Sequence, residues 1–417
     1  MRSKLKLLLV LLSFAALHGL SDAIAAQGSA QVPPAQTAAD PIKTLVDRLN
    51  VDRYKATVKS LTQFGDRRQG TERNRNAINW IEQQLKSYGC ANIERLKYDY
   101  QPPNPDLRST MANTAGGPGK PTPPGSISVG GGTPRGLRVL TGINNDPNAQ
   151  PDPKLRALDT PPSLPGAREE IYCTKVGAIH PEEMYIVSAH MDGIGWGEAA
   201  NDDGSGTALV MELARVLGSA DVRTDRSVRF IFWNNEETGL DGSGAYVAQR
   251  KDLQGKEDPP GSGRYPEPKW LGMIQHDMMM FDHGMPRADG TLSKEQRPEA
   301  DINIEFQVNS KFAAQSQALA WTFEQADEKY ATDYPASVAS HMTNTDSNPF
   351  MNEVAAISLR ENERGTEIGN GWDPQWHQPT DLFKTYNDKD FLLGLNAAQT
   401  TLAATAKLAG ATIRNLN

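Results

Sequence analysis

Apolar positions along this chain follow two different periods, and the change between them predicts strands that alternate with helices. Short apolar runs bounded by Gly, Pro, Asn or Asp predict strands at residues 169–178, 184–189, 227–233, 269–275, 301–308 and 355–359. Apolar residues with a period near 3.6 predict helices at residues 206–217, 242–250, 312–330 and 390–409. Such alternation predicts an α/β fold with a mixed, largely parallel central sheet and helices on both faces.

Two further helices are predicted ahead of this pattern, at residues 41–64 and 74–89. In the second, Ala77, Ile78, Ile81 and Leu85 recur on one helical face, and Gly89 is a stop signal. Residues 101–166 differ, because their many prolines and glycines cannot sustain a helix or a central strand. We therefore expect one domain over residues 41–417 with an insertion at about 101–166.

The amino terminus has the features of a cleaved secretory signal. A basic start is followed by an apolar middle and by the small-residue exit Ala23-Ile24-Ala25, which predicts a signal peptide at residues 1–25 and a flexible tether at 26–40. A membrane anchor is the alternative, but His18, Gly19 and Asp22 interrupt the apolar stretch. We therefore expect an exported protein, periplasmic or secreted, without stable membrane insertion.

Composition narrows the classes of partner. The 417 residues carry a formal net charge of −8, which disfavours a nucleic-acid or anionic-membrane partner. Cys90 and Cys173 are the only cysteines, too few for a Cys-rich zinc site. In an oxidising compartment they could pair, and two separate buried thiols are the alternative.

Charged residues collect where predicted strands end, which is where ligands bind in such sheets. His190 and Asp192 follow the strand at 184–189, and Asp192 could orient a metal-binding imidazole of His190. Asp202 and Asp203 precede the helix at 206–217. A helix N-cap needs only one of these acids, so the other has a separate use.

Three more clusters follow later in the chain. Glu236 and Glu237 leave a strand together and would repel each other without a cation or a proton, although a solvated loop is the simpler interpretation. Asp277 ends another apolar strand, where an unpaired carboxylate is costly to bury; its neighbour His276 should face the opposite side. His377 lies in a loop close to Asp381. The combined set suits zinc: His190, Asp202, Glu237, Asp277 and His377.

These motifs resemble the co-catalytic di-zinc metallopeptidases, a family of secreted bacterial aminopeptidases related to glutamate carboxypeptidase and glutaminyl cyclase. The resemblance implies a zinc-dependent exopeptidase fold and two Zn²⁺ ions per chain. It implies that Asp202 bridges both ions, that His190 and Asp277 complete one site, and that Glu237 and His377 complete the other. Glu236 would be the general base, Asp192 would support His190, and the peptide link after Asp202 would be cis.

The sequence departs from the family pattern in two places. Trp376 stands where relatives have a tyrosine that stabilises the developing oxyanion, and an indole N–H would donate in a different geometry. The pocket segment keeps Asp346 and Phe350 but has Glu353-Val354-Ala355 in place of a Gly-Ile-Pro run, and it adds Arg360 and Arg364. These changes bear on substrate preference.

The leading hypothesis is a zinc aminopeptidase that acts on peptides with a free amino terminus. The alternatives are a carboxypeptidase of the same fold, in which Arg360 or Arg364 holds a terminal carboxylate, a one-zinc glutaminyl cyclase, and a non-catalytic binding module. The sequence lacks a G-x-S-x-G elbow at Ser205 or Ser243, an H-E-x-x-H motif and a phosphate-binding loop. It does not determine the oligomeric state.

Overall fold

The structure is a computed structural model that describes residues 40–102, 148–158, 164–281, 302–331, 333–342, 344–361, 373 and 375–414. Residues 39–417 form one compact unit. The predicted signal peptide and tether, apart from Asp40, lie outside the described residues, as does most of the predicted insertion. Within the described ranges, no helix is both long and apolar enough to span a bilayer.

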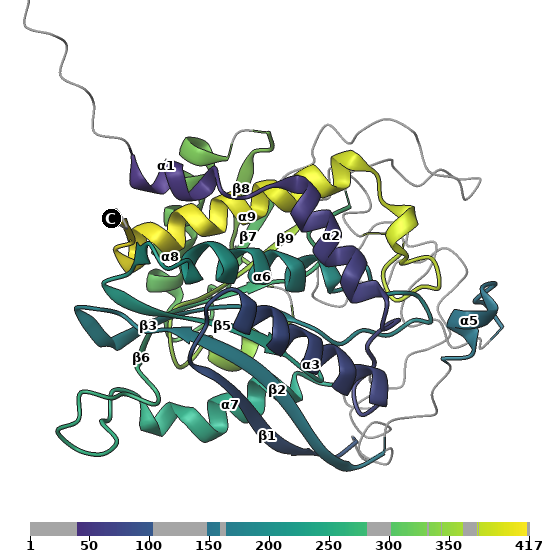
Figure 1. The fold of residues 1–417 in the computed structure, drawn as a ribbon, viewed down its shortest axis with the longest axis horizontal. Helices are drawn as coiled ribbons and strands as arrows, with labels where there is room; N and C mark the ends of the chain where they lie inside the picture. The colour runs from purple at the N-terminus through teal and green to yellow at the C-terminus, as the bar shows by residue number, and fades with distance from the viewer. Residues whose placement is uncertain are drawn as a thin grey trace, which may run out of the picture. The chain divides into compact units, whose positions relative to one another are not determined.

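A mixed sheet of eight strands organises the described residues, in the order β1-β2-β5-β3-β6-β9-β7-β8 (Figure 1). The strands are β1 (Ile93–Tyr100), β2 (Gly166–Lys175), β3 (His180–His190), β5 (Arg226–Trp233), β6 (Lys269–His276), β7 (Ile302–Phe306), β8 (Ala336–Ala339) and β9 (Ala356–Glu361). The central strands β5, β3, β6 and β9 are all parallel. β1 and β2 pair antiparallel with their neighbours, and β7 pairs antiparallel with β9 but parallel with β8. β4 (Val222–Arg223) and β10 (Thr412–Ile413) form a separate small pair.

The helices are α1 (Pro41–Val46), α2 (Val51–Thr62), α3 (Glu72–Ser87), α5 (Pro153–Arg156), α6 (Gly204–Gly218), α7 (Asp241–Arg250), α8 (Ala313–Tyr330) and α9 (Asp388–Ala409). Short 3₁₀ turns η1, η2 and η3 span Lys251–Leu253, Asn348–Phe350 and Phe383–Thr385. The single helix expected at 41–64 is two helices, because Asn50 caps α2 and starts a new direction. The strand β1 was not predicted.

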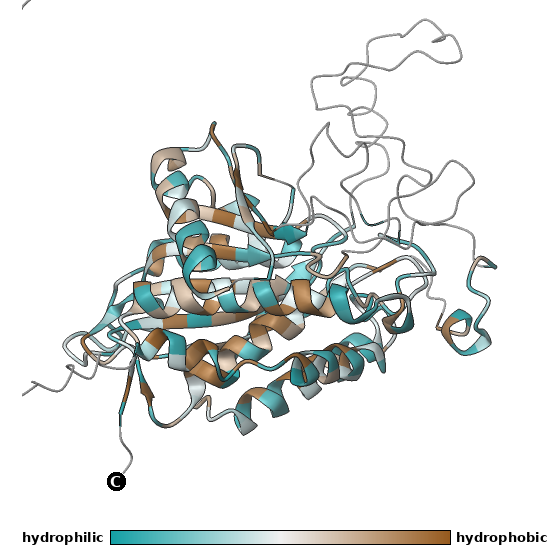
Figure 2. Cartoon of the chain, turned by 90° about the horizontal axis from the view of Figure 1, so that it is seen from above, coloured by the Kyte–Doolittle hydropathy of each residue, from teal (hydrophilic) through white to brown (hydrophobic). Residues whose placement is uncertain are grey.

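Helices cover both faces of the sheet, as the sequence predicts. Alternate residues of a strand point to opposite faces, so Phe230 and Phe232 of β5 pack in the larger core under α2, α3, α6 and α9, and Ile231 and Trp233 pack in the smaller core with α7. In Figure 2 the hydrophobic colour runs along the strands and along the helix surfaces beside them. Both faces of the sheet are therefore buried at its central strands, which explains why the parallel strands are continuous apolar runs in the sequence.

A disulfide joins Cys90, just after α3, to Cys173 in β2, with the Cα atoms 6.3 Å apart. Of the two possibilities that the sequence left open, pairing is the one observed. The bond ties the end of α3 to the sheet, and disulfides persist mainly in oxidising compartments. It is compatible with export.

Candidate active site

The parallel strands bring three acidic or basic clusters to one edge of the sheet. His190 is the last residue of β3, Asp277 directly follows β6, and Glu236 and Glu237 follow β5 after two asparagines. Because β5, β3 and β6 are neighbours with the same direction, their carboxyl ends meet. The loops before α6 and before η3 add Asp202 and His377 to the same place.

Asp202 lies between the two histidines, with one carboxylate oxygen toward each. Its Oδ1 is 3.3 Å from Nε2 of His190, and its Oδ2 is 3.1 Å from Nε2 of His377. Asp277 Oδ1 lies 3.7 Å from Nε2 of His190, and Glu237 Oε2 lies 2.8 Å from Nε2 of His377. All five predicted ligands therefore come together, in two groups that share Asp202.

These separations suit metal coordination. Two ligands of one tetrahedral zinc ion, each about 2.0–2.1 Å from it, are roughly 3.3 Å apart. His190, Asp202 and Glu237 offer ligand atoms within 4.8 Å of one another, and so do His190, Glu236 and Asp277. Within the described residues, Oε1 of Glu237 is buried and accepts no hydrogen bond. A buried carboxylate oxygen without a donor fits a cation beside it.

The electrostatics of the cluster point in the same direction. Burial raises the pKa of Glu237 to about 7 and raises the pKa of Glu236 well above its usual range. Burial also opposes ionisation of Asp202, but hydrogen bonds from His190 and His377 outweigh it and hold the pKa of Asp202 well below its usual range. Such divergent pKa values among neighbouring groups are typical of functional sites.

The two adjacent aspartates before α6 have separate roles, as expected. Asp203 is the N-cap: its Oδ1 accepts from the backbone N–H of Gly206 at 2.8 Å, and its Oδ2 accepts from the N–H of His190 at 3.2 Å. Asp202 faces the cluster instead. The peptide bond between them is cis, as the family resemblance implies.

Asp192 connects His190 with the glutamate loop. Its Oδ1 accepts a hydrogen bond from the backbone N–H of Glu236 at 3.2 Å. Nδ1 of His190 lies 3.1 Å from the backbone oxygen of Asp192 but 3.9 Å from its carboxylate, so the acceptor that orients the ring here is the carbonyl. His276 points away from the cluster, toward Ser188 O and Thr401 Oγ1, which agrees with the expected alternation.

A cavity of about 320 Å³ opens over these side chains. Its lining is His190, Asp202, Glu236, Glu237, Thr238, Gly239, Asp277, Asn344, Arg360, Trp376 and His377. Arg360 pairs with the Asp277 carboxylate at 3.2 Å. The Trp376 ring stacks on that of His377, with centroids 4.1 Å apart. Arg364 lies outside the described residues.

The expected pocket residues Asp346 and Phe350 are fully buried and are not part of this lining. Asp346 accepts a hydrogen bond from Ser243 Oγ at 2.6 Å beneath the site, and Phe350 packs on Trp233. They support the cavity floor from inside the core.

Some residues that position the site loops were not predicted from the sequence. Gln150, within the predicted insertion, is fully buried and donates to the carbonyls of Trp196 and Pro379, at 2.7 and 3.0 Å. Arg67, between α2 and α3, and Asn74, in the first turn of α3, bind the site loops. Their partners are mostly backbone carbonyls, which no residue spacing reveals. The only sequence signal around Arg67 is the pair Gly65 and Gly70, which indicates turns on either side of it.

Comparison with known proteins identifies the family of this chain and proteins that share its fold. The sequence profile described as Peptidase family M28 matches residues 172–400. Aminopeptidase YwaD of Bacillus subtilis is 45% identical over 80 residues, 19% of this chain and 17% of the relative. Carboxypeptidase Q of Xenopus laevis is 34% identical over 76 residues, 18% of this chain and 16% of the relative. The matches thus span under a fifth of these two relatives' lengths.

Solved structures share the fold. The crystal structure of BSAP, a zinc aminopeptidase from Bacillus subtilis, superposes with a TM-score of 0.57 at 15% identity. The match covers 88% of this chain and 96% of that one. At this identity the likeness supports the architecture alone.

Proposed function

Since this chain belongs to peptidase family M28 and is a metal-dependent peptidase, we propose that it is an exported aminopeptidase with two zinc ions and Glu236 as general base. The observation that carries the proposal is the position of Asp202, whose two carboxylate oxygens face His190 and His377 separately. A single carboxylate shared in this way divides the five predicted ligands into two sets.

Each set would hold one ion. His190 and Asp277 form the first with Oδ1 of Asp202, and His377 and Glu237 form the second with Oδ2. Zinc bound here supplies Lewis-acid polarisation of a peptide carbonyl and lowers the pKa of a water molecule. The three buried ligand carboxylates, Asp202, Glu237 and Asp277, favour cation binding.

Glu236 performs the proton transfers in this proposal. It lines the cavity, and Asp192 fixes its backbone N–H. Its carboxylate removes a proton from water as the water oxygen bonds to the carbonyl carbon. It then gives that proton to the peptide nitrogen as the C–N bond breaks. The substrate's positively charged amino terminus is attracted by the acidic lining of the cavity.

Hydrolysis of aminoacyl anilides tests the proposal. Activity should disappear after dialysis against a chelator and return when Zn²⁺ is added, with two ions bound per chain. Replacement Glu236→Gln should keep both ions and lower kcat by about 10²–10⁴-fold. Hydrolysis that persists without metal, or a wild-type rate in E236Q, contradicts the proposed mechanism. One ion per chain contradicts the di-zinc assignment.

Arg360 favours a second candidate, a carboxypeptidase of the same fold. Its guanidinium lines the cavity beside Asp277, where a bidentate pair with a substrate's terminal carboxylate is chemically reasonable. Peptides blocked at the amino end and peptides amidated at the carboxyl end separate the two activities. Cleavage of N-acetylated but not of C-amidated peptides would favour the carboxypeptidase.

A further inference from the structure

Arg67 is a fully buried cation whose hydrogen bonds go to backbone carbonyls. It lies between α2 and α3, outside the residues matched by the family profile. Its Nε donates to Met191 O at 2.7 Å, one Nη donates to Glu198 O at 2.9 Å, and the other donates to Ala199 O at 2.8 Å. A fourth bond to Gly65 O, at 3.1 Å, fixes the guanidinium within its own segment.

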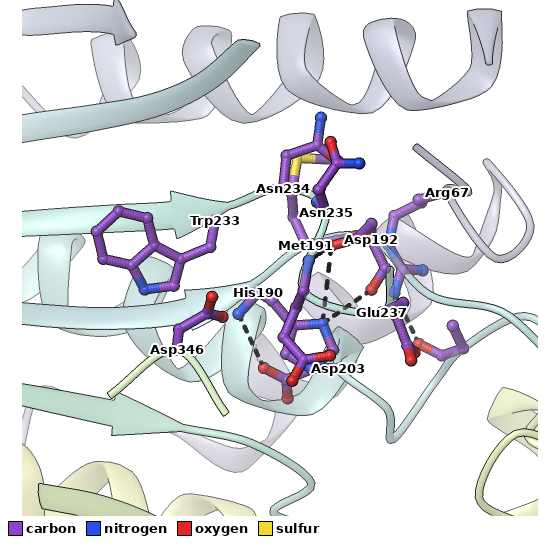
Figure 3. A network of polar contacts seen from close by, with 12 residues as sticks. Arg67, His190, Met191, Asp192, Asp203, Trp233, Asn234, Asn235, Glu237 and Asp346 are labelled. Carbon is purple, nitrogen blue, oxygen red and sulfur yellow. Dashed lines mark hydrogen bonds and ion pairs between the residues drawn. The ribbon is translucent and has the colours of Figure 1, made fainter. Parts of the chain in front are cut away.

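Three of the carbonyls that Arg67 binds lie in the loop between β3 and α6, near its two ends, where candidate ligands lie. Met191 lies between His190 and Asp192, and Glu198 and Ala199 lie just ahead of Asp202. Figure 3 shows Arg67 beside Asp192 and the Met191 backbone. One planar group with donors in fixed directions therefore sets how far the His190 end of this loop lies from its Asp202 end.

Asn74, in the first turn of α3, connects Arg67 to a second site loop, the one that follows β5. Its Nδ2 donates to Arg67 O at 2.7 Å, and its side-chain amide exchanges two 3.1 Å hydrogen bonds with that of Asn234. The Asn234 Oδ1 also accepts from the N–H of Asn235, so the amide pair fixes the backbone just before Glu236. Figure 3 shows Asn234 and Asn235 on this loop.

The chemistry of Arg67 argues against a merely space-filling role. Among the described residues no carboxylate is paired directly with it, although Asp66, Asp192, Asp203 and Asp381 surround it and oppose the lowering of its pKa by burial. Burying a cation is costly unless its donors are satisfied, and here carbonyls of the site loops satisfy them. A lysine has three donors on a flexible stem and cannot reproduce this set of bonds.

We propose that Arg67 and Asn74 form a positioning clamp, which sets the positions of His190 and Asp202 at the two ends of one loop and of Glu236 on a second loop, and thereby the affinity of the metal site. The inference rests on the proposed function for its metal readout. It predicts two separable effects: Arg67 controls the loop between β3 and α6, at residues 190–192 and 198–202, and Asn74 controls the loop at 234–237.

Arg67→Lys, Asn74→Ala and a matched control test the clamp. Arg229 is an equally buried arginine that bonds Thr174 Oγ1, Glu267 and Pro266 O in the smaller core, so R229K is the control. Zinc affinity is measured by competition with a chromogenic chelator, and loop opening by amide hydrogen exchange. We expect R67K to bind zinc about 10–100-fold more weakly, the usual effect of losing a group that supports a ligand.

R67K should also speed exchange at residues 190–202, and N74A should speed exchange mainly at 234–237. R229K should lower the thermal midpoint yet leave zinc affinity and both loops unchanged. The clamp is overturned if R67K is destabilised like R229K but keeps wild-type zinc affinity and loop exchange. If R67K does not fold, N74A decides, because it removes no buried charge, and unchanged exchange at 234–237 overturns the proposal.

The clamp and the proposed function can fail separately. A wild-type protein that binds no zinc contradicts the proposed function, while hydrogen exchange in the apoprotein still reports on the clamp. Wild-type zinc binding with no loss in R67K and N74A contradicts the clamp alone.

Discussion

Gly195 lies against the backbone of His377, and its replacement by alanine should disable the site. Its φ is +98°, a conformation that L-residues rarely adopt. A Cβ built on it would lie 2.4 Å from the carbonyl carbon of His377, whereas ordinary contact begins at 3.4 Å. The His377 backbone would therefore have to move by about 1 Å, a misplacement that can cost on the order of 10²-fold in rate.

We expect Gly195→Ala to lower kcat/KM for aminoacyl anilides by about 10²-fold and to weaken zinc binding, because Nε2 of His377 moves away from Asp202 and Glu237. Gly261→Ala is the matched control. Its φ is +78° and a Cβ there meets nothing within 4 Å, so it carries the left-handed strain of roughly 1–2 kcal/mol without the clash.

Both variants should lose stability in denaturant unfolding, G195A at least as much as G261A, and only G195A should lose activity. A G195A protein within about threefold of wild type in kcat/KM and in zinc affinity would refute the contact as a determinant of His377 position. Equal loss of activity in G261A would show that backbone strain, not the contact, is responsible.

Three further predictions concern stability. Burial raises the pKa of Asp327 from 3.8 to about 7 in the folded protein. The protonated side chain therefore stabilises the folded state fully below about pH 4, and this stabilisation is lost as the pH rises through 7, at up to about 1.4 kcal/mol per pH unit. Asp327→Asn should therefore flatten the stability profile between pH 5 and 7 in denaturant titrations, and an unchanged slope would contradict this. Replacing Cys90 and Cys173, which are 83 residues apart, by alanine should cost about 4 kcal/mol of unfolding free energy, and a loss below about 1 kcal/mol would contradict the loop-closure account. When the free zinc concentration is 100 times the dissociation constant, removing the zinc should lower the free energy of unfolding by about 2.7 kcal/mol, which is visible as a lower thermal midpoint. An unchanged midpoint would indicate that zinc does not bind the folded state.

The parallel part of the fold could be predicted because its strands are buried on both faces and appear as continuous apolar runs. The edge strand β1 was missed, although Leu96, Tyr98 and Tyr100 alternate with exposed residues there. A half-exposed strand carries less apolar signal, and this one ends beside the proline-rich segment. The division between α1 and α2 depends on Asn50, the N-cap of α2. Its capping role can be recognised only once the directions of both helices are known.

The candidate site could be predicted to the extent that its chemistry lies in side chains at strand ends. His190 and Asp277 are such residues, and their convergence follows from the parallel order of β3 and β6. Arg67 could not be found in this way, because a lone arginine in a loop resembles a solvated residue and its partners are carbonyls that every residue has. The same holds for Gln150.

The candidate ligands are spread from residue 190 to residue 377, on loops that follow neighbouring strands joined by long crossover connections. Such contacts form late in folding, because distant parts of the chain must be brought together first. During synthesis His377 is among the last of these residues to leave the ribosome. The complete set of ligands therefore cannot come together before residue 377 has been made, so no shorter fragment of the chain holds the whole metal centre.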